Sequence, residues 1–104
     1  MAIKQLTKEN YHKEVTSSKH PVLIDFWAPW CVPCRALTPV VEQLSKELAG
    51  KVKIMQVNID EEQELTQQFR VMSIPTLAVV RGGRLSATAV GVKPRTHILK
   101  MLEE

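Results

Sequence analysis

The sequence predicts one α/β domain over residues 1–104, with a mixed central five-stranded sheet flanked by four helices in the order β-α-β-α-β-α-β-β-α. A near-continuous apolar run at 21–27 is typical of a strand covered on both faces, and residues 52–60 are predicted to form a second central strand. Apolar side chains repeat at helical spacing between these runs, and two further strand-like runs flank a Gly-Gly pair at 82–83, which indicates a hairpin. Alternating strands and helices favour parallel pairing in the first half, and the hairpin adds an antiparallel pair.

The composition is that of a globular domain. The chain has 104 residues, of which 44% are hydrophobic and 24% are charged, and its formal net charge is +3. Basic residues are scattered among acids. The loose group Arg81, Arg84, Lys93 and Arg95 is explained better by a solvated end of the sheet than by a nucleic-acid site. No signal peptide or membrane span is recognisable, so we expect a cytoplasmic monomer without nucleic-acid or membrane partners.

The first two elements are expected to be short. Residues 2–6 are predicted to form a strand, and residues 8–17 a helix with Thr7 as its N-cap. Tyr11 and Val15 lie four positions apart on that helix, so both are expected to face inward.

The longest helix is predicted over residues 33–49, with Gly50 ending it. Pro39 lies inside this helix and is expected to kink it, because proline has no N–H to donate to the preceding turn. The inward stripe consists of five residues at helical spacing: Leu37, Val40, Val41, Leu44 and Leu48.

The strand at 52–60 is expected to lead into a helix over 61–69, with Leu65 and Phe69 as its inward pair. The hairpin strands follow around the Gly-Gly pair.

These hairpin strands are predicted at 75–81 and 85–90. Pro94 then begins a last helix, since proline is favoured in the first turn. Its buried stripe is expected to be Ile98, Met101 and Leu102.

Asp25 interrupts the apolar run at 21–27. Burying a lone carboxylate costs several kcal/mol unless it is neutral or paired. A carboxylate turned to solvent at the strand end is the alternative, and the apolar residues around Asp25 disfavour it. Because the only two cysteines of the chain follow within ten residues, a buried Asp25 suggests a functional role.

Cys31 and Cys34 stand where this strand ends and the long helix begins. Half a zinc site would need further ligands, and the three histidines show no recognisable ligand spacing. Two inert core thiols would be a coincidence of spacing. A redox dithiol fits best, because unpaired N–H groups and the positive dipole end at a helix start favour a thiolate. Pro33 has no N–H to leave unsatisfied and stiffens the turn.

The stretch "DFWAPWCVPCR" resembles the active-site segment of the thioredoxin family, which usually reads W-C-G-P-C-K/R. "SIPTLAVVRGG" and "AVGV" match later segments of the family, so the resemblance covers essentially the whole chain. It implies the thioredoxin fold and a thioredoxin-type protein-disulfide reductase with a Cys31/Cys34 dithiol. It also implies recycling by a thioredoxin reductase or equivalent electron donor, protein disulfides as substrates, and no metal or bound organic cofactor.

The resemblance also implies roles for three residues. Cys31 matches the exposed cysteine that attacks a substrate disulfide, and Cys34 matches the shielded thiol that resolves the mixed disulfide. Asp25 matches the buried aspartate beneath the second cysteine. A carboxylate in apolar surroundings keeps its proton to higher pH, so it can exchange that proton with Cys34 near neutrality.

Substrate binding is implied at an apolar rim. Pro75 matches a proline that the family holds in the cis form, although only about 5% of X–Pro bonds in folded proteins are cis. A cis bond there would turn the Ile74 backbone outward, where an extended substrate could pair with it. Gly91 would permit close backbone approach, and Trp27 is expected to be a buried packing residue. The rim comprises Trp30, Ile74, Pro75, Gly91 and Val92.

Two residues depart from the family pattern. Val32 replaces the usual glycine between the cysteines, and Gln56 stands where a lysine is frequent near the buried aspartate. Because Val32 and Pro33 are expected to tune the redox poise, a more oxidising protein or one with a dedicated partner is a second hypothesis. A binding module within a larger assembly is a third, which the intact dithiol disfavours.

Overall fold

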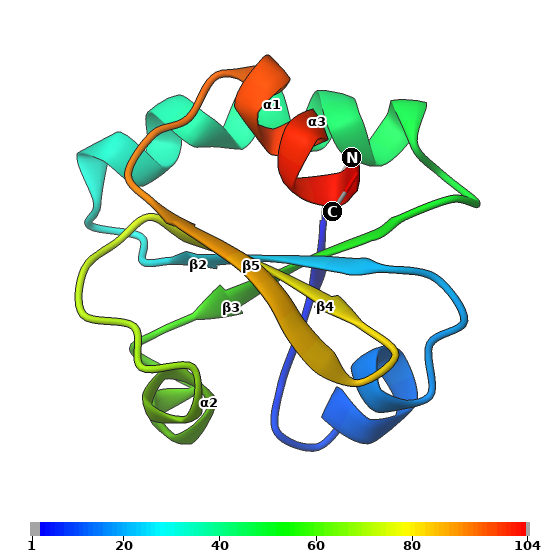
Figure 1. Cartoon of the computed structure of the whole chain (residues 1–104). Helices are drawn as coiled ribbons and strands as arrows, with labels where there is room; N and C mark the ends of the chain where they lie inside the picture. The colour runs from blue at the N-terminus through cyan, green and yellow to red at the C-terminus, as the bar shows by residue number, and fades with distance from the viewer. Residues whose placement is uncertain (1–2, 104) are drawn as a thin grey trace.

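The computed structural model describes residues 3–103 and contains one mixed sheet of five strands (Figure 1). The strand order is β1-β3-β2-β4-β5. β3 (Lys53–Asn58) pairs in parallel with β1 (Lys4–Gln5) on one side and β2 (Val22–Trp27) on the other. β4 (Thr76–Arg81) is antiparallel both to β2 and to β5 (Arg84–Val90). The predicted mixed five-stranded sheet is therefore confirmed.

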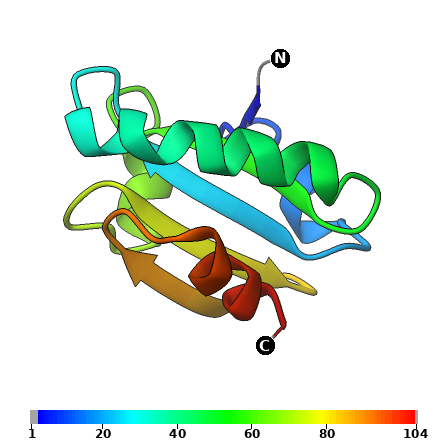
Figure 2. The ribbon, with the colours of Figure 1, turned by 90° about the horizontal axis from the view of Figure 1, so that it is seen from above.

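Helices cover both faces of this sheet. α1 (Val32–Glu47) and α3 (Arg95–Glu103) lie above it in Figure 1, whereas α2 (Gln63–Gln68) and the π-helix η1 (His12–Thr16) lie below it. Seen from above, α1 runs over the middle of the sheet and α3 lies beside it over β5 (Figure 2). None of the helices in the described part of the chain is long and apolar enough to cross a membrane.

The central strand β2 is buried on both faces because its side chains alternate between two cores. Leu23 belongs to the cluster under α1 and α3, together with Leu37, Val41 and Ile98. Val22, Ile24 and Phe26 belong to the cluster on the side of η1 and α2. By the same alternation Asp25 points to the α1 side, which is also the side of the cysteines.

The predicted helix over 8–17 is wrong in type and extent. The side chains of Thr7 and Asn10 each accept the other's backbone N–H, at 3.2 and 2.7 Å, and close a separate turn. The following segment is η1, in which the N–H of Ser17 reaches back five residues to the carbonyl of His12. Thr7 thus caps a turn rather than a long helix. Val15 is buried as expected, and Tyr11 is half-buried against the same core.

The remaining boundaries differ by a few residues. The first strand is shorter than predicted, and Ala2 at its expected start lies outside the described residues. α1 contains Pro39, and Gly50 adopts a φ of +85° just after the helix. α2 is shorter than the predicted helix at both ends.

The predicted inward residues of these helices are all buried or half-buried. Six are buried: Leu37, Val41, Leu44, Leu65, Ile98 and Met101. Four pack on the cores while half-buried: Val40, Leu48, Phe69 and Leu102. The hairpin is also confirmed, since Gly82 and Gly83 have φ of +55° and +80°, as the tight two-residue turn requires.

Candidate active site

The two cysteines form a disulfide at the junction of β2 and α1. Their Cα atoms are 5.3 Å apart, within the usual range for such a bond. Cys31 is the N-cap of α1: its backbone is extended, and its Sγ accepts the backbone N–H of Cys34 at 3.2 Å. Pro33 lies in the first turn. Sequence reasoning therefore placed the sulfur pair correctly, at the positive end of a sixteen-residue helix.

The expectation of an exposed Cys31 is wrong for this oxidised form. Cys31 is 4% exposed and Cys34 is 2% exposed, so both cysteines are buried. They form a small cluster with Ala28, against which Trp27 and Ile74 pack. Cys31 is therefore bonded to Cys34 within an apolar cluster and has little contact with solvent.

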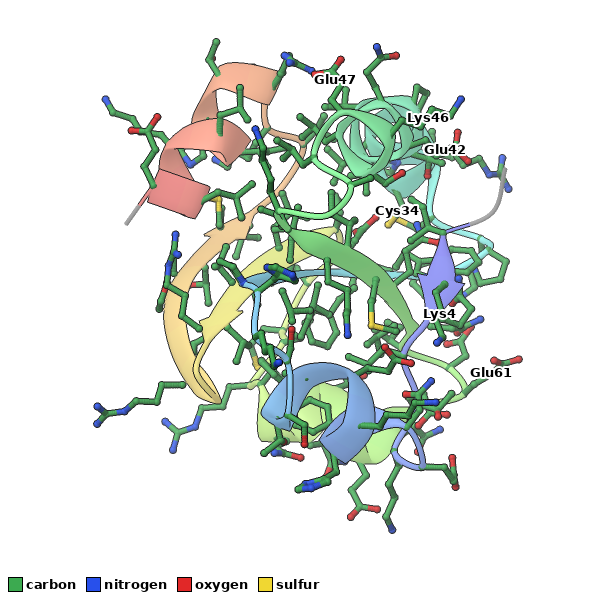
Figure 3. All side chains as sticks on the ribbon, turned by 90° about the vertical axis from the view of Figure 1, so that its right-hand side faces the viewer. Lys4, Cys34, Glu42, Lys46, Glu47 and Glu61 are labelled. Carbon is green, nitrogen blue, oxygen red and sulfur yellow. A yellow bond between two sulfur atoms is a disulfide. The ribbon has the colours of Figure 1, made fainter. Side chains whose placement is uncertain are left out.

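Asp25 is buried on the α1 side of the sheet, the side on which Figure 3 shows Cys34. It is 1% exposed, so the alternative of a carboxylate turned to solvent is wrong. Its Oδ2 accepts a hydrogen bond from Nε2 of Gln56 at 3.2 Å, and its Oδ1 has no partner among the described residues. Burial raises the pKa of Asp25 to about 6 from its ordinary 3.8, while the Gln56 hydrogen bond acts in the opposite direction.

The disulfide loop and the expected rim both carry exposed apolar side chains. Trp30 is 62% exposed, and its indole Nε1 donates to Oδ2 of Asp60 at 2.9 Å, which fixes the ring. Val32 and Val92 are also exposed. These side chains supply the apolar surface expected of a docking rim.

The Ile74–Pro75 bond is cis, as the resemblance implied. Pro75 is buried and contributes little surface to the rim, and Ile74 is half-buried. The carbonyl of Pro75 accepts the N–H of Gly91 at 2.8 Å. Ile74 makes no backbone hydrogen bond with another described residue, so its backbone groups are free to pair with a ligand. Gly91 has a φ of +96°, and the space where its side chain would stand is open.

Sequence reasoning missed Met72, which is 94% exposed beside the rim. It lines a cavity of about 320 Å³ together with Trp30, Ile59 and Ile74. A somewhat larger cavity of about 380 Å³ lies elsewhere, at Tyr11, and has no cysteine in its wall. No periodicity marks Met72, because it lies in an irregular segment.

Sequence reasoning also missed Gln5. Trp27 packs against the cysteine cluster as expected, but it is half-buried, and its Nε1 donates to Oε1 of Gln5 at 3.3 Å. Gln5 in turn contacts Gln56. Only the strand register brings these residues together, so the sequence alone carried no signal for Gln5. Within residues 3–103, no group of three or more His, Cys, Asp or Glu side chains could hold a metal ion.

Comparison with known proteins agrees with this geometry. The family model described as Thioredoxin matches residues 2–104. Thioredoxin 1 of Nostoc sp. is 42% identical over 103 residues, which cover 99% of this chain and 96% of that protein. The thioredoxin of Haemophilus influenzae is 43% identical over 91% of this chain and 89% of its own length. The thioredoxin of Bacillus subtilis is 41% identical over 100% of this chain and 98% of its own.

Proposed function

Because this chain belongs to the thioredoxin family, it is a thiol–disulfide oxidoreductase of the protein-disulfide reductase type, and we propose that Cys31 attacks and Cys34 resolves. The single observation that supports this order is the capping geometry. The Sγ of Cys31 accepts a backbone N–H at the start of α1, whereas Cys34 lies within the helix. In the reduced protein, that N–H and the helix dipole would stabilise a thiolate on Cys31 more than one on Cys34.

The first step is disulfide exchange. The Cys31 thiolate forms a bond with one sulfur of a substrate disulfide, and the substrate S–S bond breaks. The other substrate sulfur leaves as a thiolate and takes up a proton. The product is a mixed disulfide between Cys31 and the substrate.

The second step resolves that mixed disulfide. The Cys34 thiol gives its proton to the Asp25 carboxylate and attacks Sγ of Cys31, and the second substrate sulfur leaves as a thiolate. Two electrons have then moved to the substrate, and the protein holds the Cys31–Cys34 disulfide seen here. A general base works best when its pKa is near the operating pH, and the pKa of Asp25, about 6, meets this condition.

Partners are a reductase and disulfide-containing proteins, as in the family. The exposed side chains of Trp30 and Val92 are proposed to contact them. The free backbone of Ile74 would pair with an extended substrate segment, beside Pro75 and Gly91. We further propose that the protein acts as a monomer in the cytoplasm, where cysteine pairs usually serve catalysis rather than structure.

Serine variants of the two cysteines test the order of attack. Cys31→Ser is expected to abolish turnover, because no thiolate remains at the helix start. Cys34→Ser is expected to retain the first attack and to accumulate mixed disulfides. Mass spectrometry of each reduced variant, mixed with a disulfide-bonded protein, measures the adducts. Stable adducts on Cys34 of the Cys31→Ser protein, with none on the other variant, would reverse the assignment.

A further inference from the structure

Four side chains form a hydrogen-bonded row across three strands and end at Asp25. Register places Gln5 beside Gln56, and Gln56 beside Asp25, on neighbouring strands β1, β3 and β2. Partners in register point to the same face of a sheet, and Trp27, two positions beyond Asp25, shares that face. The bonds run from Trp27 Nε1 to Gln5 Oε1, from Gln5 Nε2 to Gln56 Oε1, and from Gln56 Nε2 to Asp25 Oδ2, at 3.3, 3.1 and 3.2 Å.

Trp27, at the outer end of this row, fixes which side chain donates and which accepts in each of its hydrogen bonds. The indole N–H of Trp27 can only donate, whereas a glutamine amide offers an oxygen on one side and an NH2 group on the other. Trp27 therefore requires the oxygen of Gln5 on its side, which turns the NH2 group of Gln5 toward Gln56. The second N–H of that group reaches the carbonyl of Ile3 at 3.3 Å, so the orientation satisfies both amide hydrogens.

The same logic fixes Gln56. Its oxygen accepts from Gln5, and its NH2 group is left to face Asp25. A reversed Gln56 would present its oxygen to Asp25, and an oxygen can accept a hydrogen bond only from the protonated carboxyl. The observed orientation favours the ionised carboxylate, and the reversed one favours the neutral acid.

We propose that Gln5 and Trp27 are positioning residues that hold the Gln56 amide in its donating orientation and so set the pH at which Asp25 accepts a proton from Cys34. The proposed role does not depend on the packing of Trp27 against the cysteine cluster. Both residues act on Asp25 through Gln56. The proposal rests on the proposed function only for its kinetic consequence, because the ionisation of Asp25 can be measured by itself.

No charged side chain is among the influences on the pKa of Asp25. On the neighbouring strands, Lys4 and Lys53 both pair with Glu14. Arg81 of β4 bonds to the carbonyl of Leu102. Arg35 of α1 bonds to the carbonyl of Pro29, and the buried titratable group on α1 is Cys34. Burial and the Gln56 hydrogen bond are the two influences on the pKa of Asp25.

The test is a carboxyl NMR titration of Asp25 in Gln5→Leu and Trp27→Phe. Gln5→Leu removes hydrogen bonds while keeping a side chain of similar size, and Gln5 is exposed on an edge strand, so its loss should leave the fold intact. Trp27→Phe removes the indole N–H and keeps an aromatic ring, although a smaller one. We expect the Asp25 titration midpoint to rise by roughly half to one pH unit in either variant. A shift of this size corresponds to the free energy of about one neutral hydrogen bond. Gln43→Leu, an exposed glutamine of α1, is the matched control and should leave the midpoint unchanged.

A double-variant cycle decides whether the effect passes through Gln56. Gln56→Leu alone should raise the Asp25 midpoint, and adding Gln5→Leu to it should have no further effect. An unchanged midpoint in Gln5→Leu, or an equal rise with and without Gln56, would overturn the proposal.

The rate of mixed-disulfide resolution, followed against pH in a single turnover, adds the kinetic readout. Its midpoint should rise together with the NMR midpoint. If the NMR midpoint moves and the rate profile does not, the row orients Gln56 as proposed but Asp25 is not the base, and the proposed mechanism fails instead.

Discussion

Burial of Asp25 lowers the free energy of unfolding at neutral pH, but it also gives the carboxyl group a pKa at which it can exchange a proton. It is 1% exposed and accepts one hydrogen bond, from a neutral amide. Its pKa of about 6 lies about two pH units above its ordinary value of 3.8, which corresponds to about 3 kcal/mol of folding free energy. Such a penalty, close to a redox disulfide, is typical of a group retained for function.

The sign of the pH effect follows from that raised pKa. Below pH 4 the carboxyl is protonated in both folded and unfolded protein, so it carries no penalty. Between about pH 4 and pH 6 the unfolded chain releases the proton and the folded protein keeps it, so stability falls as the pH rises. Asp25→Asn should therefore raise the free energy of unfolding at pH 7 by about 1–3 kcal/mol and leave it nearly unchanged below pH 4. Urea titrations at both pH values measure this difference.

Catalysis should change in the opposite direction. The Asp25→Asn variant lacks the proposed proton acceptor, so we expect resolution of the mixed disulfide to slow while the proposed first attack by Cys31 continues. A variant that is no more stable than the parent at pH 7, and that resolves mixed disulfides at the parental rate, would show that Asp25 is neither penalised nor catalytic.

Local patterns brought together the residues to which reacting roles are proposed, but not the side chains that hold them in position. Cys31, Cys34 and Asp25 lie within ten positions of one another, so a single stretch of sequence shows them together. Gln5 meets Gln56 only because β1 pairs with β3, over a separation that no local pattern spans. The burial of Cys31 likewise depends on Ile74, which approaches from a distant segment.

Among the elements, regular strands and helices were predicted well and irregular segments were not. β2 and β3 lie inside the expected segments, because a largely apolar run such as 21–27 is a strong signal for a strand buried on both faces. The sequence predicted a longer regular helix in place of η1, because Tyr11 and Val15 fit helical spacing. That spacing does not reveal the Thr7–Asn10 turn or the hydrogen bond from the backbone N–H of Ser17 to the carbonyl five residues earlier.

At the start of α1, Val32 stands where the resemblance to the family leads us to expect glycine. Val32 is 69% exposed between the cysteines, where it adds apolar surface beside Cys31 and narrows the backbone choices of the reduced loop. We expect Val32→Gly to change the reduction potential by tens of millivolts, where about 30 mV corresponds to 1.4 kcal/mol for a two-electron couple. Equilibration of each protein with glutathione measures the potential.

Val32 should also affect how efficiently a reductase reduces this protein. A partner that fits closely over glycine meets extra methyl groups here, so the valine protein should be a poorer substrate than Val32→Gly for a reductase adapted to the glycine form. Equal potentials and equal turnover in the two proteins would make the valine a neutral replacement, and would remove the case for a dedicated partner.

At the scale of the whole molecule, ion pairs of one buried carboxylate connect η1 to the sheet. Glu14 of η1 is 6% exposed and pairs with Lys4 of β1 and Lys53 of β3, the latter at 3.0 Å. Lys53 also donates to the backbone carbonyl of Glu14. Hydrogen bonds from the two lysines lower the pKa of Glu14, so its ionised form stabilises the folded state.

Glu14 and Asp25 therefore have opposite pH dependence. The stabilisation by Glu14 is fully present above its unfolded pKa, near 4.5, and is lost as the pH falls through its lower folded value. The penalty from Asp25 grows as the pH rises toward 6. From these two groups together, we expect a maximum of stability between about pH 4 and pH 5, with the Glu14 effect on the acid side and the Asp25 effect on the neutral side.

The Glu14→Gln variant separates the contribution of Glu14 to this pH dependence of stability from that of Asp25. The amide cannot pair with two ammonium groups, so at pH 7 the free energy of unfolding should fall by about 1–3 kcal/mol, the range for hydrogen bonds to charged groups. On the acid side the parent loses the same interaction by protonation, so the two curves should converge as the pH falls through the lowered folded pKa of Glu14. Glu47→Gln is the matched control, because Glu47 pairs with Arg95 at the surface, where such pairs contribute little. Denaturant unfolding from pH 3 to pH 8 measures all three proteins, and curves of parent and Glu14→Gln that stay parallel in acid would show that the Glu14 charge does not stabilise the fold.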